Sequence, residues 1–115
     1  MKRYRFALGF AALLFAGAAL ADDLSFENSD FGTAQRCLAY GKKVMAKNTE
    51  MLALLNRSTI VRKSVTENRY DEPVGRQHIG TEISAELRDG NQPTALILCL
   101  LYDKPLYFFM HPASP

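Results

Sequence analysis

The stretch 94–102, TALILCLLY, is the feature that most constrains how this chain can fold. Both alternating sets of its side chains are apolar: Leu96, Leu98 and Leu100 form one set, and Ala95, Ile97, Cys99 and Leu101 form the other. A strand with two apolar faces is typical of the middle of a sheet that has a layer on each side. We therefore predict that residues 94–102 form a central strand covered on both faces.

The first 21 residues carry the pattern of a secretory signal peptide. Positive residues at the start precede an apolar run over residues 6–20, and Ala21 and Asp22 flank the expected cleavage site. The run is shorter than the roughly 20 residues that span a bilayer, so we expect no membrane anchor after cleavage. The chain is thus divided into a signal peptide, 1–21, and one small domain, 22–115, exported to the periplasm.

Removal of the signal peptide changes the charge balance. The whole chain has 14 basic and 12 acidic residues, and Lys2, Arg3 and Arg5 lie in the signal peptide. Eleven basic residues then face twelve acidic ones, which gives a net charge of −1. A domain with this balance lacks the basic footprint of nucleic-acid binding, so no nucleic-acid partner is expected.

The two cysteines, Cys37 and Cys99, are predicted to form a disulfide bond, because an exported chain of this size meets an oxidising environment. The bond would close a loop of about 60 residues and stabilise the domain by roughly 4 kcal/mol in the chain-entropy model. Two independent thiols are the alternative. The redox motif C-x-x-C is absent from the sequence.

Residues 33–56 have the pattern of an amphipathic helix, with apolar or small side chains three and four positions apart. Gly41 falls on the apolar stripe and would allow close approach to a sheet. The pattern is disturbed near Asn48, where Thr49 could cap a second helix. One long bent helix and two helices both fit the sequence.

Four strands are predicted after the helix. They cover residues 58–70, 78–88, 94–102 and 106–110, with turns at 71–75, 89–90 and 103–105 and a disordered tail at 111–115. Short turns favour antiparallel neighbours, so the strands should form a meander. One face of the sheet needs the helix over it. The expected fold is a two-layer α+β domain in which an N-terminal helix packs on a four-stranded antiparallel meander.

Aromatic residues at the C-terminal end suggest a surface for a partner. Tyr102, Tyr107 and Phe109 are more rings than so short a chain needs for its core, and exposed aromatic groups often mark an interface. The last strand is also an expected sheet edge, open to pairing with another chain. A protein partner in the cell envelope and a homodimer through the last strand are both predicted from this end of the chain. The alternative is that these rings only close the core under the helix.

A row of polar residues on the strand 78–88 is the second candidate site. His78, Glu82 and Glu86 alternate with apolar residues and should share one face, together with Ser84. With His111 they could bind a metal ion or a small ligand. Alternation alone also produces such a row on an ordinary solvated sheet face. The metal hypothesis is therefore the alternative, and His78 and Glu82 are also candidates for contact with a protein.

Motifs for catalysis are absent from the sequence: there is no G-x-S-x-G, no H-E-x-x-H and no glycine-rich phosphate loop. We expect no enzyme activity and no cofactor. The sequence best fits a small periplasmic protein that acts by protein binding, as an inhibitor, an immunity-type factor or an envelope accessory factor. A periplasmic protein that binds a metal or a small ligand is the alternative.

Overall fold

The computed structural model describes residues 26–114. The predicted signal peptide and its cleavage between Ala21 and Asp22 lie outside these residues, so both stay predictions. Within the described range, no helix is long and apolar enough to cross a membrane. Two helices and a five-stranded antiparallel sheet form the fold, which confirms the predicted α+β class.

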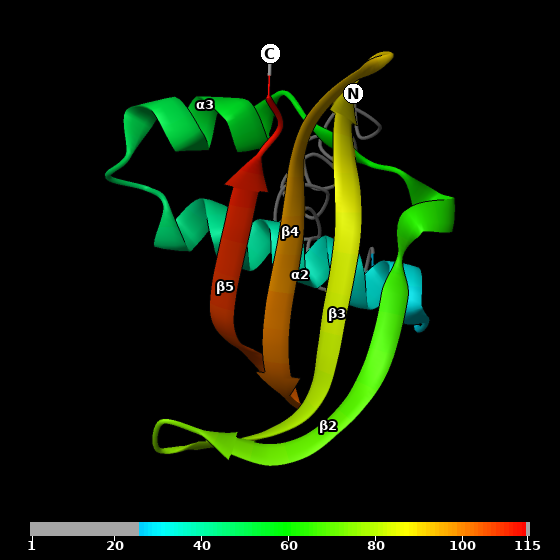
Figure 1. Cartoon of the computed structure of the whole chain (residues 1–115), viewed down its shortest axis with the longest axis vertical. Helices are drawn as coiled ribbons and strands as arrows, with labels where there is room; N and C mark the ends of the chain where they lie inside the picture. Colours follow the sequence, from blue (N-terminus) through cyan, green and yellow to red (C-terminus); the bar gives the residue numbers. More distant parts are fainter. Residues whose placement is uncertain (1–25, 115) are drawn as a thin grey trace, which may run out of the picture.

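Helix α2 crosses one face of the sheet at a steep angle to the strands (Figure 1). The elements are α2 Asp30–Val44, α3 Thr49–Asn56, β1 Thr59–Ile60, the 3-10 turn η1 Arg62–Ser64, β2 Thr66–Val74, β3 Gln77–Asp89, β4 Gln92–Tyr102 and β5 Lys104–Pro112. We name the sheet face toward α2 the inner face and the opposite one the outer face.

The strands β2, β3, β4 and β5 are neighbours in chain order and all antiparallel, so the predicted meander is confirmed. Strand β4, which contains the stretch 94–102, lies between β3 and β5 and is central as expected. The prediction of four strands is wrong, because residues 58–70 form two strands, β1 and β2. Both pair with the same edge of β3, at different ends.

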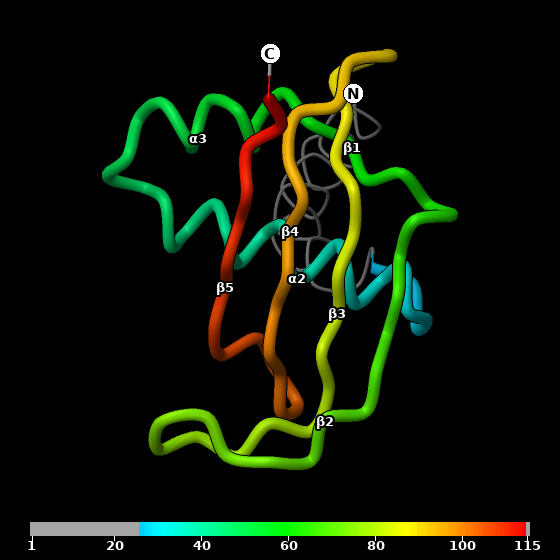
Figure 2. The backbone as a smooth tube through the Cα atoms, viewed as in Figure 1, coloured from blue at the N-terminus to red at the C-terminus, as the bar shows by residue number. Residues whose placement is uncertain are grey.

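The interruption between β1 and β2 has a local cause (Figure 2). The Val61 N–H still donates to the Glu86 carbonyl, at 2.9 Å. The Glu86 N–H instead donates to the Ser64 hydroxyl, at 2.8 Å. The Ser64 hydroxyl therefore takes the place of a backbone carbonyl as the acceptor for Glu86, and the backbone leaves the ladder in η1 before β2 begins.

The hairpin of β2 and β3 is longer than predicted, so the expected turn at 71–75 is wrong. The ladder continues to Val74, and Pro73 is tolerated because β2 is an edge strand that needs no N–H there. The turn begins at Gly75, which has a φ of 61°. A bulge at Asp71, with a φ of 54°, bends the hairpin so that it curls past the ends of β4 and β5 (Figure 1).

Strand β5 is also longer than predicted. It runs to Pro112, and the Ala113 N–H donates to the Thr94 carbonyl at 2.8 Å. The expected disordered tail at 111–115 is therefore wrong for residues 111–113, while Pro115 lies outside the described residues. The backbone hydrogen bond to β4 is what holds this end in place.

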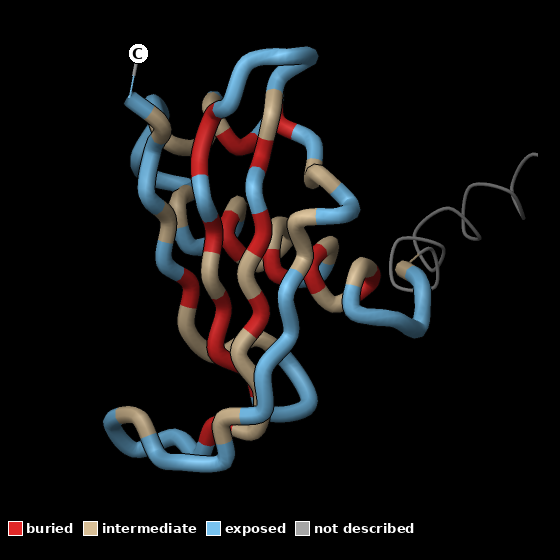
Figure 3. Tube along the Cα trace, turned by 45° about the vertical axis from the view of Figure 1, so that its right-hand side comes forward, coloured by how far each residue is buried: buried red, intermediate tan, exposed pale blue. Residues whose placement is uncertain are grey.

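The core lies between α2 and the inner face (Figure 3). The inner-face residues of the three main strands are buried: Ile83, Ala85 and Leu87 of β3, Ala95, Ile97, Cys99 and Leu101 of β4, and Phe108 of β5. Gly41 of α2 lies directly on Phe108, since a Cβ added there would fall 2.4 Å from the Phe108 ring. The close approach predicted for Gly41 is confirmed.

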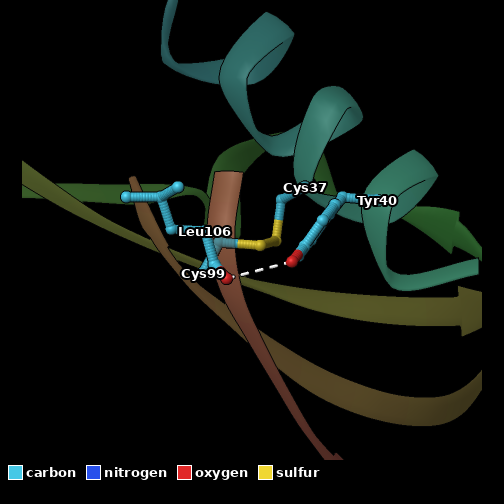
Figure 4. The surroundings of a disulfide bond; sticks show 4 residues. All are labelled: Cys37, Tyr40, Cys99 and Leu106. Atoms are coloured by element: carbon cyan, nitrogen blue, oxygen red, sulfur yellow. Dashed lines mark hydrogen bonds between the residues drawn. A yellow bond between two sulfur atoms is a disulfide. The ribbon is translucent and has the colours of Figure 1, made fainter. Parts of the chain in front are cut away.

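The predicted disulfide bond joins Cys37 of α2 to Cys99 of β4, and both cysteines are fully buried. One turn further along α2, the Tyr40 hydroxyl donates to the Leu106 carbonyl of β5 at 2.9 Å (Figure 4). The disulfide bond spans 62 residues of sequence and, in the chain-entropy model, stabilises the fold by roughly 4 kcal/mol. The helix is thus tied covalently to β4 and by a hydrogen bond to β5.

The region 33–56 forms two helices, which decides between the two alternatives left open by the sequence. The Ser29 hydroxyl caps α2 by accepting from the Gly32 N–H at 3.2 Å. The Asn48 carboxamide caps α3 by accepting from the Met51 N–H at 3.1 Å. The cap is therefore Asn48, and the expectation of Thr49 is wrong by one position.

Candidate functional site

The outer face presents three rows of side chains that run across β3, β4 and β5. From the α3 end of the sheet toward the β2–β3 hairpin, the register gives Glu86, Leu96 and His111, then Ser84, Leu98 and Phe109, then Glu82, Leu100 and Tyr107. Each row passes from a polar group on β3 through a leucine on β4 to a ring on β5. On the outer face, β3 therefore carries the polar side chains and β4 the apolar ones, and this difference is the same in all three rows.

The first two rows are not covered by another layer. Leu96 is 53% exposed and Phe109 is 52% exposed, whereas their inner-face neighbours Ala95 and Phe108 are 4% and 8% exposed. Within residues 26–114, nothing packs on this part of the outer face. The prediction that the stretch 94–102 is covered on both faces is therefore wrong.

The exposed leucine and phenylalanine border a shallow groove of about 330 Å³. Leu96, Leu98 and Phe109 supply its apolar surface, and Glu86 and His111 lie on opposite sides of Leu96 in the first row. The groove offers apolar contact area with a carboxylate on the β3 side and an imidazole on the β5 side. Such a surface suits a protein side chain better than a polar metabolite.

Tyr107, a predicted contact residue, has a structural role at the other end of the outer face. Its hydroxyl donates to the Val74 carbonyl at 2.9 Å, close to the turn of the hairpin. Its row neighbour Leu100 is only 6% exposed. The curled hairpin thus closes the third row, and the apolar surface that remains open is confined to the first two.

His78 and Tyr102 lie together near the bend of the hairpin, apart from the apolar groove. The His78 Nε2 is 3.0 Å from the Asp71 Oδ1, and the imidazole meets the Tyr102 ring edge-on with 5.3 Å between centroids. Tyr102 is 55% exposed. This pair could contribute to contact with a partner, but it is not continuous with Leu96 and Phe109.

The residues proposed for a metal site are not brought together. His78 pairs with Asp71, Glu82 accepts a hydrogen bond of 3.4 Å from Asn68, and His111 lies two strands away from β3. In the part of the chain that the structure describes, no group of three or more His, Cys, Asp or Glu could hold a metal ion. Nothing in the geometry adds support to the metal hypothesis.

The free edge of β5 is short. Because Ala113 donates to Thr94, alternation of the ladder turns the backbone groups of Phe108 and Met110 away from β4. The Leu106 carbonyl, which points the same way, is already bonded to Tyr40. Pro112 has no N–H to offer. The homodimer through this strand stays a prediction, and only a short stretch of backbone is open for it.

Arg62 of η1 fixes the segment before α2. Its guanidinium pairs with the Glu27 carboxylate at 2.7 Å and lies 3.8 Å above the centre of the Phe31 ring. The hydrogen bond from Arg62 lowers the pKa of Glu27 below its usual value of 4.5. Both charged groups are exposed, so this contact positions the N-terminal segment without contributing much to stability.

Sequence reasoning missed Leu96 and Leu98, which it assigned to a covered face. The predicted bond from Cys37 to Cys99 indicates that the helix lies on the other apolar set, but nothing in the sequence indicates that the set of Leu96 and Leu98 would stay uncovered. Comparisons with protein-family models, with curated proteins and with solved structures find no match for this chain.

Proposed function

We propose that this is a small exported protein that binds another protein of the cell envelope through the outer face, at Leu96, Leu98 and Phe109. The observation that carries the proposal is the half-exposure of Leu96 and Phe109, which lie in adjacent rows of the outer face on the neighbouring strands β4 and β5. Apolar groups gathered on a monomer surface commonly mark a protein contact. An inhibitor, an immunity-type factor and an envelope accessory factor all act in this way.

Rigidity makes this surface suitable for binding. The disulfide at Cys99 and the packed inner face fix β4 and β5 from behind. A partner that docks on Leu96 and Phe109 would therefore not need to order a flexible segment, and less free energy would be lost on association.

Charge at the rim favours a particular kind of partner. Glu82 and Glu86 lie on β3, beside the apolar side chains of β4, and Ser84 lies between them on the same face. A partner that presents apolar side chains flanked by Lys or Arg would match both features. Its basic residues would contact β3 while its apolar residues cover β4 and β5.

Export to the periplasm is part of the same proposal. The buried Cys37–Cys99 disulfide supports an oxidising compartment, and the predicted signal peptide supplies the route. Envelope extract is therefore the place to look for the partner.

The test is capture of the partner from envelope extract by the oxidised protein, with mass spectrometry as the readout. A Leu96→Ser, Phe109→Ser double variant should capture about tenfold less of the partner, because central apolar contacts dominate interface energy. Val44→Ser is the matched control, since Val44 is 48% exposed but lies on α2.

Both variants must first give the thermal unfolding curve of a folded protein. Loss of one stoichiometric partner in the outer-face variant, with retention in the Val44→Ser control, supports the proposal. Equal capture by the two variants would show that the outer face is not the binding surface, and a blank with the unmodified protein would remove the proposed function.

A further inference from the structure

A second concave surface lies on the helix side of the sheet. It is a cleft of about 710 Å³ between α2 and the beginning of β5. The residues that matter for its chemistry are Arg36, Tyr40 and Lys43 from α2, Gln77 from the hairpin, and Lys104 and Leu106 from β5. Neither Leu96 nor Phe109 takes part in it.

The cleft is positively charged. Arg36, Lys43 and Lys104 are all exposed, and no Asp or Glu is found among the described residues that line it. The ion pairs found within residues 26–114 are made by other cations, Arg57, Arg62 and His78. The chain after the predicted signal peptide has a net charge of −1, so this concentration of positive charge is not a consequence of composition.

Local structure explains two of the three cations separately. Lys43 lies in the last turn of α2, where a positive charge is favourable to the helix dipole. Lys104 begins an edge strand, where charge discourages unwanted strand pairing. Arg36 has neither role, because it lies in the middle of α2. The meeting of all three in one cleft is therefore the feature that calls for a ligand.

We propose that this cleft binds an acidic peptide segment of a partner protein. Carboxylates of the segment pair with Arg36, Lys43 and Lys104, and its apolar side chains pack against Tyr40 and Leu106. The inference rests on the proposed protein-binding function but places a second contact on the opposite side of the sheet. The charge it selects is also opposite, since the outer face carries Glu82 and Glu86.

The lining favours a peptide over a simple inorganic anion. Part of the cleft wall is apolar, and the volume exceeds what a single phosphate or carboxylate would fill. Gln77 offers an amide donor and an acceptor, as a peptide backbone requires. Arg36 presents the planar fork that pairs with a carboxylate through two hydrogen bonds.

The test uses fluorescence anisotropy with the oxidised, exported protein and a labelled short peptide that alternates glutamate with leucine. The peptide that alternates glutamine with leucine is the control ligand. Arg36→Gln and Lys104→Gln should each weaken binding of the acidic peptide about three- to tenfold. Lys63→Gln, which removes an exposed charge from η1, should leave the affinity unchanged.

Three results would overturn the proposal. The first is equal affinity of the Arg36→Gln and Lys63→Gln variants for the acidic peptide. The second is displacement of the peptide by citrate at the same carboxylate concentration as unlabelled peptide, which would make the cleft a general anion site. The third is a tenfold rise in affinity in an Asp22→Asn, Asp23→Asn variant, which would identify the chain's own aspartates as the occupant.

The Leu96→Ser, Phe109→Ser variant separates this proposal from the proposed function. It should bind the acidic peptide as well as the unmodified protein does, because neither residue lines the cleft. Loss of peptide binding in that variant would contradict a separate site on the helix side.

Discussion

The inner and outer faces of strand β4 are both apolar, but the inner face is buried and the outer face is partly exposed to solvent. On β4, Ile97 is 2% exposed while Leu96 next to it is 53% exposed, although both are large aliphatic residues. The inner face is covered by α2, which the Cys37–Cys99 disulfide attaches to β4. An apolar side chain on this strand is therefore buried only where another layer of the fold packs against its face.

The two ends of the outer face differ as well. The third row is closed by the hairpin, through the hydrogen bond of Tyr107 to Val74, and its leucine is buried. The first two rows have no such neighbour in the range 26–114. The exposed patch is therefore what remains after both α2 and the hairpin have been placed.

Phe108 and Phe109 give the strongest test of the comparison, because they are adjacent, identical in type and on opposite faces. Phe108→Ala should lower the free energy of unfolding by about 3–5 kcal/mol, since it opens a cavity under α2. Phe109→Ala should lower it by less than about 1 kcal/mol, because that ring is already half in water. Urea unfolding of both variants measures the difference. Equal losses would mean that the outer face is covered in solution.

Gly41→Ala tests how closely α2 lies on the inner face. Alanine is the better helix former by roughly 1 kcal/mol, so an unpacked helix would be stabilised by the change. Here the new methyl group would fall 2.4 Å from the Phe108 ring, and we expect a net loss of about 1–3 kcal/mol. Thermal unfolding gives the sign of the effect. A rise in melting temperature would contradict the close packing of α2 on β5.

Glu27→Gln should give the smallest effect, because it acts at an exposed contact outside both faces. Arg62 lowers the pKa of Glu27, so the ionised carboxylate is favoured in the folded state. The stabilisation is therefore present above the usual pKa of 4.5 and is lost as the pH falls through the lowered pKa of the folded state.

Melting temperatures of the Glu27→Gln variant and the unmodified protein should accordingly differ slightly at pH 7 and converge as the pH falls below the lowered pKa of Glu27. Glu67→Gln, an exposed carboxylate on β2, is the control for loss of a charge alone. A difference that grows on acidification would show that the Arg62 contact does not stabilise the fold.

Local patterns were sufficient to predict most of the elements. The polar row of His78, Glu82 and Glu86 was predicted to alternate with apolar residues on β3, and the large apolar residues of that other set are buried: Ile79, Ile83 and Leu87. The ends of the strands were predicted less well, because hydrogen bonds with neighbouring strands extend them beyond the limits that the local sequence indicates. Pro73 suggested a turn but lies in an edge strand, and residues 111–113 suggested a tail but are held by the bond from Ala113 to Thr94.

The candidate site was predicted only in part. Phe109 was named from the aromatic character of the last strand and does lie on the exposed patch, whereas Tyr107 from the same reasoning holds the hairpin. Two cations of the cleft, Arg36 and Lys43, are two turns apart on α2, whereas Lys104 comes from β5, far along the sequence. Lys104 joins the other two only through the packing of α2 on β5, which no local pattern contains.

The sequence by itself determined the helix, the meander and the pairing of the two cysteines, because each depends on periodicity, on turn residues or on the presence of only two thiols. Only the tertiary structure decided that the other apolar set of the stretch 94–102 would stay uncovered. The predicted disulfide already places the helix on the side of Cys99, but nothing in the sequence indicates whether a second layer covers the side of Leu96. Within residues 26–114, α2 is the one helix that crosses the sheet, and it lies on the Cys99 side, which leaves Leu96 and Phe109 facing solvent.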